Sequence, residues 1–336
     1  MLKLGFIGCG GIANHHANVI ARNVPGIKIT AGADVNAEAL KKFGAARAGV
    51  ALYTDLRRML AQADIDAVCV AVPTGVHKKA AVAAANAGKH VFLEKPMAMS
   101  LRDADAIIDA CDKAGLKLMV GQVRRYDNEW GTFKKLIHSG AIGRPVLWRQ
   151  TAGGGQPGPK WFMDAKMGGG PFMDGAVHNW DFANCVFGKP REALGSIMRF
   201  LPSTALDTGT AVVRYESGDE VLVAWSWGLP GGASASYIFD ALGPKGVIRF
   251  PGSFADSEYP KKFDHGKYGA YLVQTGAKKR LVKFRRNDMF AEEWKDFYRA
   301  VTRNAAPKVT GREGRQALAV ALAVLKSGAS RKPANI

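Results

Sequence analysis

Short aliphatic runs alternate with segments of helical spacing over residues 1–121. Five runs are predicted as buried strands because they are short and rich in aliphatic residues: Leu2–Ile7, Ile27–Ala33, Ala67–Val72, His90–Leu93 and Leu116–Val120. The segments between them are predicted as helices: Ile12–Arg22, Ala37–Ala46, Asp55–Ala63, Val76–Ala87 and Leu101–Ala114. This alternation predicts an α/β fold with a doubly wound parallel sheet, an N-terminal Rossmann domain over residues 1–121.

The pattern changes after Gly121. Helices are predicted at Glu129–His138, Pro171–Phe187, Phe290–Thr302 and Arg312–Ser327. Extended segments are predicted at Val146–Thr151, Ala193–Arg199, Thr210–Tyr215, Glu220–Trp227, Ala235–Ala241, Val247–Phe250, Ala270–Gln274 and Arg280–Phe284. They predict a C-terminal α+β domain over residues 122–336 whose largely antiparallel sheet has one packed face and one open face. The last helix could pack back on the first domain, and the tail after Gly328 is predicted to fray.

The chain carries a surplus of positive charge. The 336 residues include 47 Lys and Arg against 29 Asp and Glu, a net charge of +18. The basic residues are scattered as doublets such as Lys41-Lys42 and Arg285-Arg286, with no recognised nucleic-acid motif beside them. We therefore expect a basic solvated surface and no nucleic-acid partner, with an anionic substrate as the alternative explanation of the charge.

The cysteines and the apolar runs indicate a cytoplasmic protein. The four cysteines lie far apart and form no C-x-x-C motif, so we expect reduced thiols: Cys9, Cys69, Cys111 and Cys185. Cys9 is interpreted as an incidental member of a glycine loop rather than as a nucleophile. The N-terminal apolar run is too short for a secretory signal, and no run approaches the roughly 20 residues that span a bilayer. No membrane partner and no metal site are expected.

A glycine motif between the first strand and the first helix predicts a dinucleotide site. It comprises Gly8, Cys9, Gly10, Gly11, Ile12 and Ala13, a G-x-G-x-x-A pattern. The first glycine permits the tight turn, the second lets the main chain approach a pyrophosphate, and the small Ala13 lets the helix pack close to the sheet. The N-terminus of that helix offers free N–H groups to phosphates.

Asp34, at the end of the second strand, indicates the cofactor. A carboxylate there can bind both ribose hydroxyls and would repel a 2′-phosphate, and no arginine follows at once to neutralise one. NAD is therefore predicted over NADP, with a plain helix N-cap as the other interpretation of Asp34. Pro73, Thr74 and His77 follow the fourth strand, where the chain should border the nicotinamide ribose, although His77 could equally be a surface or capping residue.

Two further motifs bring a family resemblance. Glu94-Lys95-Pro96 ends the fifth strand, and the run from Gly168 to Asp181 reads GGGPFMDGAVHNWD. Together with the glycine motif they resemble the glucose–fructose oxidoreductase / inositol dehydrogenase / MocA family over nearly the whole chain. The resemblance implies His178 as proton acceptor, Asp174 as its partner and a substrate ligand, and Lys95 as the polarising cation. It also implies a homo-oligomer, a dimer or a tetramer, formed through the open sheet face.

The residues support these roles by their own chemistry. Asp174 and His178 are four apart, so on a helix they share one face, and a carboxylate beside an imidazole fixes its tautomer. Lys95 ends a parallel strand, at the sheet edge where such folds place ligands, and its ammonium can stabilise a developing oxyanion. Glu94 and Lys95 are also expected beside the cofactor. Each motif alone could be structural, a strand end entering a turn or a surface helix pair.

Substrate-side candidates are Arg124 and Tyr126 after the sixth strand, Lys160 and Trp161 before the glycine run, and Asn179 beside His178. A tryptophan can cover the apolar face of a sugar, but it could equally be core. Arg124, Arg125 and Tyr126 could instead brace the domain junction.

The sequence thus predicts an NAD-dependent oxidoreductase that moves hydride between the nicotinamide and a hydroxyl carbon of a sugar, sugar derivative or cyclitol. One alternative is a redox-assisted glycosidase or lyase that uses the same site and regenerates its cofactor. A dinucleotide-binding sensor without chemistry is a third interpretation.

Overall fold

A computed structural model describes residues 1–336, and the chain divides into two compact units. The first comprises Met1–Val123 and Met289–Leu318, and the second comprises Arg124–Asp288 and Ala319–Ile336. The division lies two residues from the predicted boundary, but Met289–Leu318 joins the first unit instead of the second.

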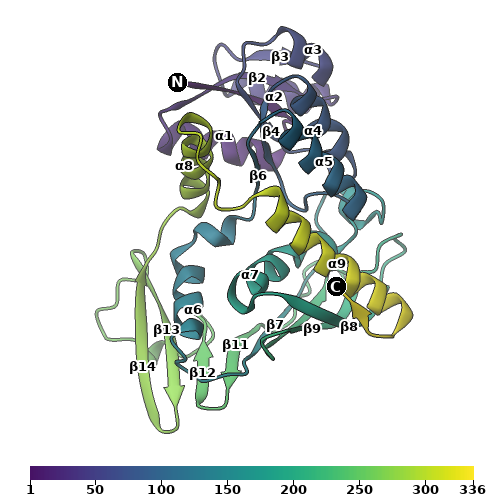
Figure 1. Cartoon of the computed structure of the whole chain (residues 1–336). Coiled ribbons are helices and arrows are strands. Elements are labelled where there is room, and N and C mark those ends of the chain that lie inside the picture. The colour runs from purple at the N-terminus through teal and green to yellow at the C-terminus, as the bar shows by residue number, and fades with distance from the viewer. The chain divides into compact units, whose positions relative to one another are not determined.

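The first unit contains the predicted doubly wound sheet (Figure 1). Six parallel strands lie in the order β3-β2-β1-β4-β5-β6: β1 (Leu2–Ile7), β2 (Ile27–Ala33), β3 (Ala51–Tyr53), β4 (Ala67–Val70), β5 (His90–Leu93) and β6 (Leu118–Val120). This is the strand order of dinucleotide-binding folds, which confirms the predicted Rossmann architecture. The strand β3 was not predicted, since three residues are too few to show a period of two.

The helices of the first unit follow the prediction closely. They are α1 (Gly11–Asn23), α2 (Ala37–Ala45), α3 (Leu56–Gln62), α4 (His77–Asn86), α5 (Leu101–Lys113) and α8 (Met289–Thr302), followed by the start of α9 (Gly311–Ser330). Side-chain caps explain three of the starts, because Asn36, Asp55 and Ser100 accept backbone N–H groups of α2, α3 and α5.

Helix α8 belongs to the first unit because its apolar face is buried there. Trp294 and Phe297 are fully buried, and the Trp294 ring stacks on Phe92 of β5 with centroids 4.3 Å apart. Large aromatic side chains contribute the most burial per residue, so this face fixes the helix to the sheet. Its place in the chain, after strand β14 (Lys278–Arg285) of the second unit, gave no sign of that packing.

The second unit is built on a nine-stranded mixed sheet. Its order is β14-β13-β12-β11-β7-β10-β9-β8-β15, in which β7 and β10 are parallel and the other pairs antiparallel. The strands are β7 (Leu147–Gly153), β8 (Pro190–Met198), β9 (Thr208–Tyr215), β10 (Glu220–Ser226), β11 (Ile238–Gly243), β12 (Gly246–Arg249), β13 (Tyr268–Thr275), β14 (Lys278–Arg285) and β15 (Ala334–Asn335). The predicted, largely antiparallel sheet is confirmed.

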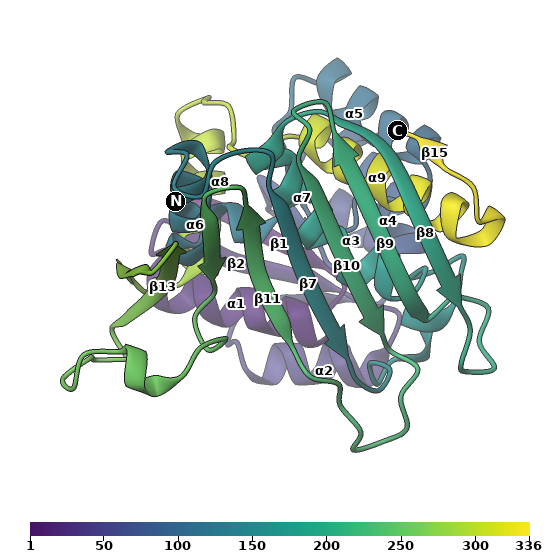
Figure 2. The ribbon, with the colours of Figure 1, turned by 90° about the horizontal axis from the view of Figure 1, so that it is seen from below.

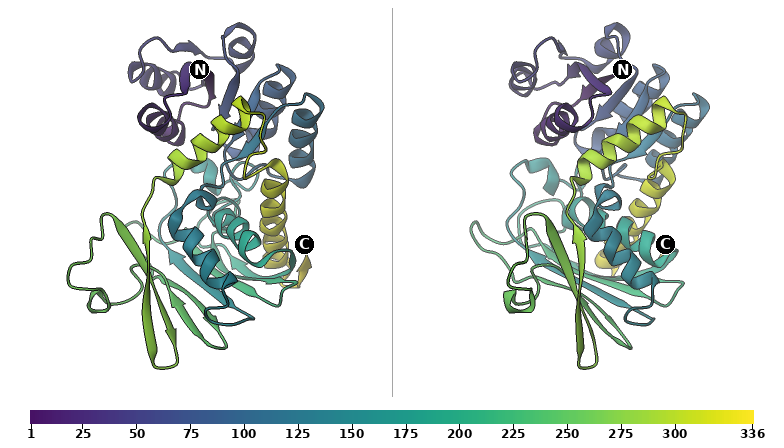
Figure 3. Two further views of the ribbon diagram at one scale, coloured as in Figure 1. Left: turned by 60° about the vertical axis from the view of Figure 1, so that its left-hand side comes forward. Right: turned by 90° about the vertical axis from the view of Figure 1, so that its left-hand side faces the viewer.

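Helices α6 (Asn128–His138) and α7 (Val177–Phe187) cover one face of this sheet, and Figure 2 looks onto the other, open face. Trp130 and Phe133 of α6 pack against Trp148 of β7 and against Phe250. On the open face alternate positions of β7 stay half-exposed, which is the expected result of a sheet packed on one side. Figure 3 shows β13 and β14 as a long hairpin at one edge.

Two predicted features of the second unit need correction. The tail after Gly328 does not fray: β15 pairs with β8, and Ser327 ties the turn by donating to the Lys332 carbonyl and accepting from the Gly195 N–H. The helix predicted over Pro171–Phe187 is in fact two elements, a π-helical turn at Pro171–Gly175 and then α7. The structure contains no helix of the length and apolar character needed to cross a membrane.

Candidate active site

The glycine loop of the first unit has the geometry of a phosphate cradle. Gly8 has φ +93°, and a Cβ there would lie 2.4 Å from the Ala71 carbonyl oxygen, so only glycine fits. Added Cβ atoms at Gly10 and Gly11 would meet nothing within 4 Å, which leaves the N-terminus of α1 open to a ligand. Ala13 is fully buried, as the close packing of helix and sheet requires. The loop therefore fits a dinucleotide pyrophosphate.

Asp34 is joined to this loop. Its Oδ2 accepts the backbone N–H of Cys9 at 2.7 Å, and its Oδ1 accepts the N–H of Asn36 at 2.8 Å. The cap of α2 is Asn36, whose side chain accepts from Ala39, so Asp34 is not the helix cap. A half-buried carboxylate held against the glycine loop is consistent with a ribose ligand.

Burial makes Cys9 a poor candidate for a nucleophile. Its side chain is 1% exposed, and burial, with the nearby Asp34 charge, raises the pKa of its thiol to about 12. A thiol that stays protonated is a poor nucleophile.

His77 lies inside the first unit and not on its surface. Its ring nitrogens lie 2.9 Å from the Pro96 carbonyl oxygen and 2.8 Å from the Val72 carbonyl oxygen. Burial lowers the pKa of His77 although both carbonyls favour the charged ring. Because both carbonyl oxygens only accept, a neutral His77 donates to one of them, and its ring is enclosed between the turns around Pro73 and Pro96. Its contact with a cofactor stays a prediction. Thr74 is likewise buried, in a short 3-10 turn.

Lys95 lies in a turn that the unit holds tightly. Its peptide bond to Pro96 is cis, and its neighbours Glu94 and Pro96 are buried while Lys95 itself is half-buried. The Lys95 backbone N–H donates to Glu94 Oε2 at 3.0 Å. The turn follows β5, at the carboxyl edge of the parallel sheet, as predicted.

In the second unit, a π-helical turn carries Asp174 directly before α7 carries His178. The turn is closed by the Ala176 N–H donating to the Pro171 carbonyl at 2.7 Å, and such turns are often found at functional sites. Gly170 has φ +78°, and a Cβ there would lie 2.5 Å from the Leu206 carbonyl oxygen, which explains the glycine before the turn. Asp174 is buried and His178 is half-buried.

The arginine pair braces α7. Arg125 makes a bidentate ion pair with Asp181, with N–O distances of 2.8 and 2.7 Å, and Arg124 donates to the Asn179 Oδ1. The Arg124 guanidinium also lies over the Trp130 ring, 4.4 Å from its centroid. Burial lowers the pKa of Arg124 to about 10, although the negative charge of Asp181 by itself would raise it. Both arginines therefore brace the helix that carries His178, a structural role within the second unit that differs from the domain-junction brace considered for them from the sequence. Asn179 is fully buried and part of that brace.

Tyr126 is buried next to the pair, and its backbone carbonyl accepts from Asn287. Lys160 is exposed and Trp161 half-buried, both on a 3-10 turn at Lys160–Met163. The Trp161 ring stacks on Phe162 with centroids 3.8 Å apart.

Two tryptophans beside the π-helical turn were not predicted. A Cβ added at Gly175 would lie 3.1 Å from the ring of Trp227 and 3.4 Å from that of Trp225. Phe162 meets Trp227 edge to face with ring centroids 5.9 Å apart, so a cluster of aromatic rings lies against the turn that carries Asp174. The pattern Trp-Ser-Trp at the end of a predicted strand was the available signal, because alternate residues of a strand share one face.

The candidate residues thus form two groups. The first unit brings together the glycine loop, Asp34 and the Glu94–Lys95–Pro96 turn, and the second brings together Asp174, His178, the arginine pair and the tryptophans. No group of three or more His, Cys, Asp or Glu side chains is arranged to hold a metal ion.

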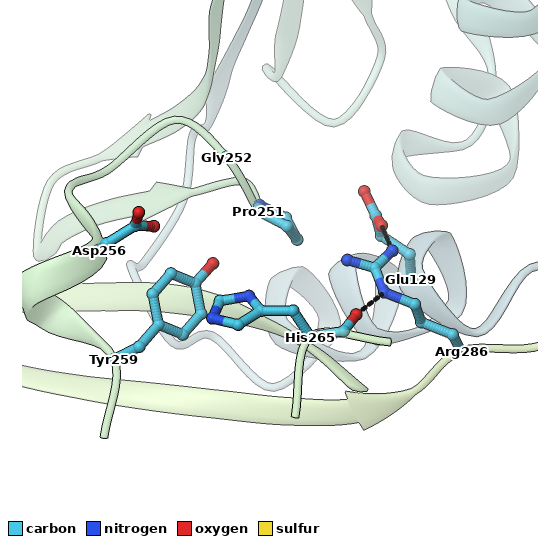
Figure 4. A pocket seen from close by; sticks show the side chains of 7 residues that line it. All are labelled: Glu129, Pro251, Gly252, Asp256, Tyr259, His265 and Arg286. Atoms are coloured by element: carbon cyan, nitrogen blue, oxygen red, sulfur yellow. Dashed lines mark hydrogen bonds and ion pairs between the residues drawn. The ribbon is translucent and has the colours of Figure 1, made fainter. Parts of the chain in front are cut away.

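A separate polar pocket of about 280 Å³ opens in the second unit (Figure 4). Glu129, Tyr259, His265 and Arg286 line it, and the Arg286 guanidinium lies 3.9 Å from the Glu129 carboxylate. Burial, with the charge of Asp127, raises the pKa of Glu129 to about 7.

This shift predicts a pH-dependent stability. Because the folded-state pKa lies above the ordinary value of 4.5, the folded state holds the proton more tightly, and Glu129 costs stability as the pH rises from about 4.5 to 7. Glu129→Gln should gain at most about 3 kcal/mol in the free energy of unfolding at pH 8 relative to its effect at pH 4.5. Urea unfolding across that range measures the gain, with the exposed Glu38→Gln as control. If the free energies of unfolding of wild type and Glu129→Gln change with pH in the same way, the prediction is contradicted.

Comparison with protein families agrees with this geometry. The model described as "Oxidoreductase family, NAD-binding Rossmann fold" matches residues 2–122, and the GFO/IDH/MocA C-terminal domain model matches residues 130–249.

Two curated relatives match over almost the full chain. A myo-inositol 2-dehydrogenase of Thermotoga maritima is 28% identical, and the match covers 97% of this chain and 96% of the relative. An uncharacterised oxidoreductase of Bacillus subtilis is 30% identical, with coverages of 99% and 96%. Among solved structures, the WlbA dehydrogenase of Bordetella pertussis in complex with NADH and UDP-GlcNAcA is 25% identical, with a TM-score of 0.81 over 100% of this chain and 98% of that one.

Proposed function

The chain belongs to the GFO/IDH/MocA oxidoreductase family, and on that premise we propose that it oxidises a secondary hydroxyl of a sugar, sugar derivative or cyclitol with NAD. The observation that carries the proposal is the Glu94–Lys95–Pro96 turn. It presents a half-buried ammonium group from the same sheet edge as the open glycine loop. Relatives that are named as inositol dehydrogenases support the substrate class.

Bound NAD supplies the acceptor for the hydride that leaves the hydroxyl carbon. His178 takes the hydroxyl proton, so the C–H and O–H bonds break and a carbonyl forms. The Lys95 ammonium donates to the same oxygen and stabilises the negative charge that develops on it. Asp174 orients the His178 ring and stabilises the imidazolium. The Trp225 and Trp227 rings offer an apolar surface to a sugar ring.

The first test is NADH formation across neutral sugars, sugar acids, sugar phosphates, inositols and glycosides. Steady NADH growth with one chemical group supports the dehydrogenase and names its substrate. Higher kcat/KM for the acids or phosphates would show that the charge of +18 serves an anionic substrate. Glycoside consumption without net NADH would replace the proposal by redox-assisted cleavage, and NAD binding without any turnover would favour a sensor.

Asp34→Ala should weaken NAD binding about tenfold and reduce the preference for NAD over NADP, because the carboxylate both binds the ribose hydroxyls and repels a 2′-phosphate. Fluorescence titrations with NADH and NADPH measure both constants. Asp34→Asn is the matched variant, since it keeps a side chain that can hydrogen-bond the Cys9 N–H but removes the charge. An unchanged ratio of the two constants in both variants would contradict the ribose assignment.

The open face of the second sheet is proposed as a contact between copies of the chain. Half-exposed Leu147, Leu222 and Leu242 lie on neighbouring strands there, beside the ion pair of Arg149 and Asp240. A sheet face that is not covered by helices and carries such leucines favours a homo-oligomer.

A further inference from the structure

The carboxylate of Glu94 is bound from two sides within the first unit. On one side the Lys95 backbone N–H donates to Oε2 at 3.0 Å, and on the other the His16 Nε2 lies 2.5 Å from Oε1. Glu94 is 7% exposed and His16 fully buried.

A third residue fixes which nitrogen of His16 carries the proton. The Trp294 Nε1 lies 2.9 Å from the His16 Nδ1, and an indole N–H can only donate. The His16 Nδ1 must therefore accept, which leaves Nε2 to carry the hydrogen and donate to Glu94. The two hydrogen bonds are therefore donated in one direction, from Trp294 to His16 and from His16 to Glu94.

Aromatic rings pack closely around His16. It contacts Phe92 and Trp294 edge to face, with centroids 5.3 and 5.5 Å away, and Phe92 and Trp294 are themselves stacked. These residues come from α1, β5 and α8, so the hydrogen bonds from Trp294 through His16 to Glu94 give helix α8 a role in this unit. Removing any one member leaves a buried polar group of its neighbour without a partner, which makes the whole set interdependent.

We propose that His16 and Trp294 are positioning residues for Lys95: they hold Glu94 in the one orientation that fixes the backbone of Lys95. Neither residue touches the reacting atoms. Their effect reaches Lys95 through the Glu94 carboxylate and the Lys95 N–H. The inference rests on the proposed function for its catalytic consequence, but the hydrogen-bonded chain can be tested without turnover.

The test compares variants of the full-length protein by amide hydrogen exchange at Lys95 and by kinetics. His16→Leu removes both hydrogen bonds of the ring, Trp294→Phe removes only the indole N–H and keeps the aromatic ring, and His16→Gln restores one donor and one acceptor. His15→Leu is the matched control, because His15 is the exposed neighbour on the same helix. Thermal unfolding identifies any variant that fails to fold, and Trp294→Phe keeps the test available if His16→Leu does not fold.

We expect Lys95 amide exchange to accelerate about tenfold in His16→Leu and several-fold in Trp294→Phe. His16→Gln should return most of the protection, and His15→Leu should match the wild type. With a substrate in hand, kcat should fall about tenfold or more in His16→Leu while the Kd for NADH stays within about twofold, since the glycine loop is untouched.

Unchanged Lys95 exchange in both His16→Leu and Trp294→Phe would overturn the inference. Faster exchange with unchanged kcat would also overturn it, because the chain would then be structural only. If the wild type oxidises no compound, the proposed function falls, whereas the exchange data still decide whether His16 and Trp294 hold Lys95.

Discussion

Lys95→Ala should reduce hydride transfer by about 100- to 1000-fold or more while NADH still binds. The ammonium is the one group proposed to stabilise charge on the reacting oxygen, and removing such a donor costs this much in other enzymes. NADH binding should survive because the glycine loop and Asp34 hold their geometry without Lys95. Single-turnover NADH formation measures the rate of hydride transfer, and fluorescence titration measures the Kd for NADH.

Two companion variants make the Lys95 result specific. Lys95→Arg keeps the charge but replaces a compact ammonium by a broad planar group, so it should recover little of the rate. Lys113→Ala removes an exposed lysine at the end of α5 in the same unit and should leave the rate unchanged. Loss of NADH binding in Lys95→Ala without a separate defect in transfer would assign Lys95 to the cofactor instead.

The first unit could be predicted because its signals are local. Each buried strand is a continuous apolar run, and glycine and capping residues such as Ser100 mark the helix ends within a few positions. Gly8 could be interpreted correctly because its conformation depends on the turn it makes. The strand at Ala51–Tyr53 could not be predicted because it is short and mostly exposed.

The features that could not be predicted from the sequence depend on contacts between distant segments. His16 lies 78 residues before Glu94 and 278 before Trp294, so no spacing rule connects them, and His16 by itself was only a histidine in a helix. The arginine pair shows the same limit: Arg125 and Asp181 are 56 residues apart, and only the fold shows that they brace α7.

The π-helical turn at Pro171–Gly175 has a different cause. Apolar spacing cannot separate one wide turn from an α-helix, and both were predicted as one element. A π turn inserts a residue and rotates the helix after it, so the shared face expected for Asp174 and His178 from α-helical spacing cannot be deduced from the sequence.

His178→Ala should lower kcat by about 100- to 10,000-fold, the usual contribution of a positioned base. Asp174→Asn should lower it too, because the amide can no longer stabilise an imidazolium, and the double variant should be little worse than His178→Ala alone. The exposed His138, whose ring contacts the Val186 carbonyl, provides the control His138→Ala in the same unit.

The double-mutant cycle of Asp174 and His178 distinguishes a site in which Asp174 acts through His178 from one in which Asp174 binds the substrate on its own. If Asp174 acts through His178, its removal costs nothing further once the imidazole is gone, so the two losses do not add. If Asp174 binds the substrate on its own, the losses multiply, and the excess should be found in KM and not in kcat. Non-additive losses in kcat would support the carboxylate–imidazole pair, and independent losses would reduce Asp174 to a substrate ligand and leave His178 with another orienting group to be found.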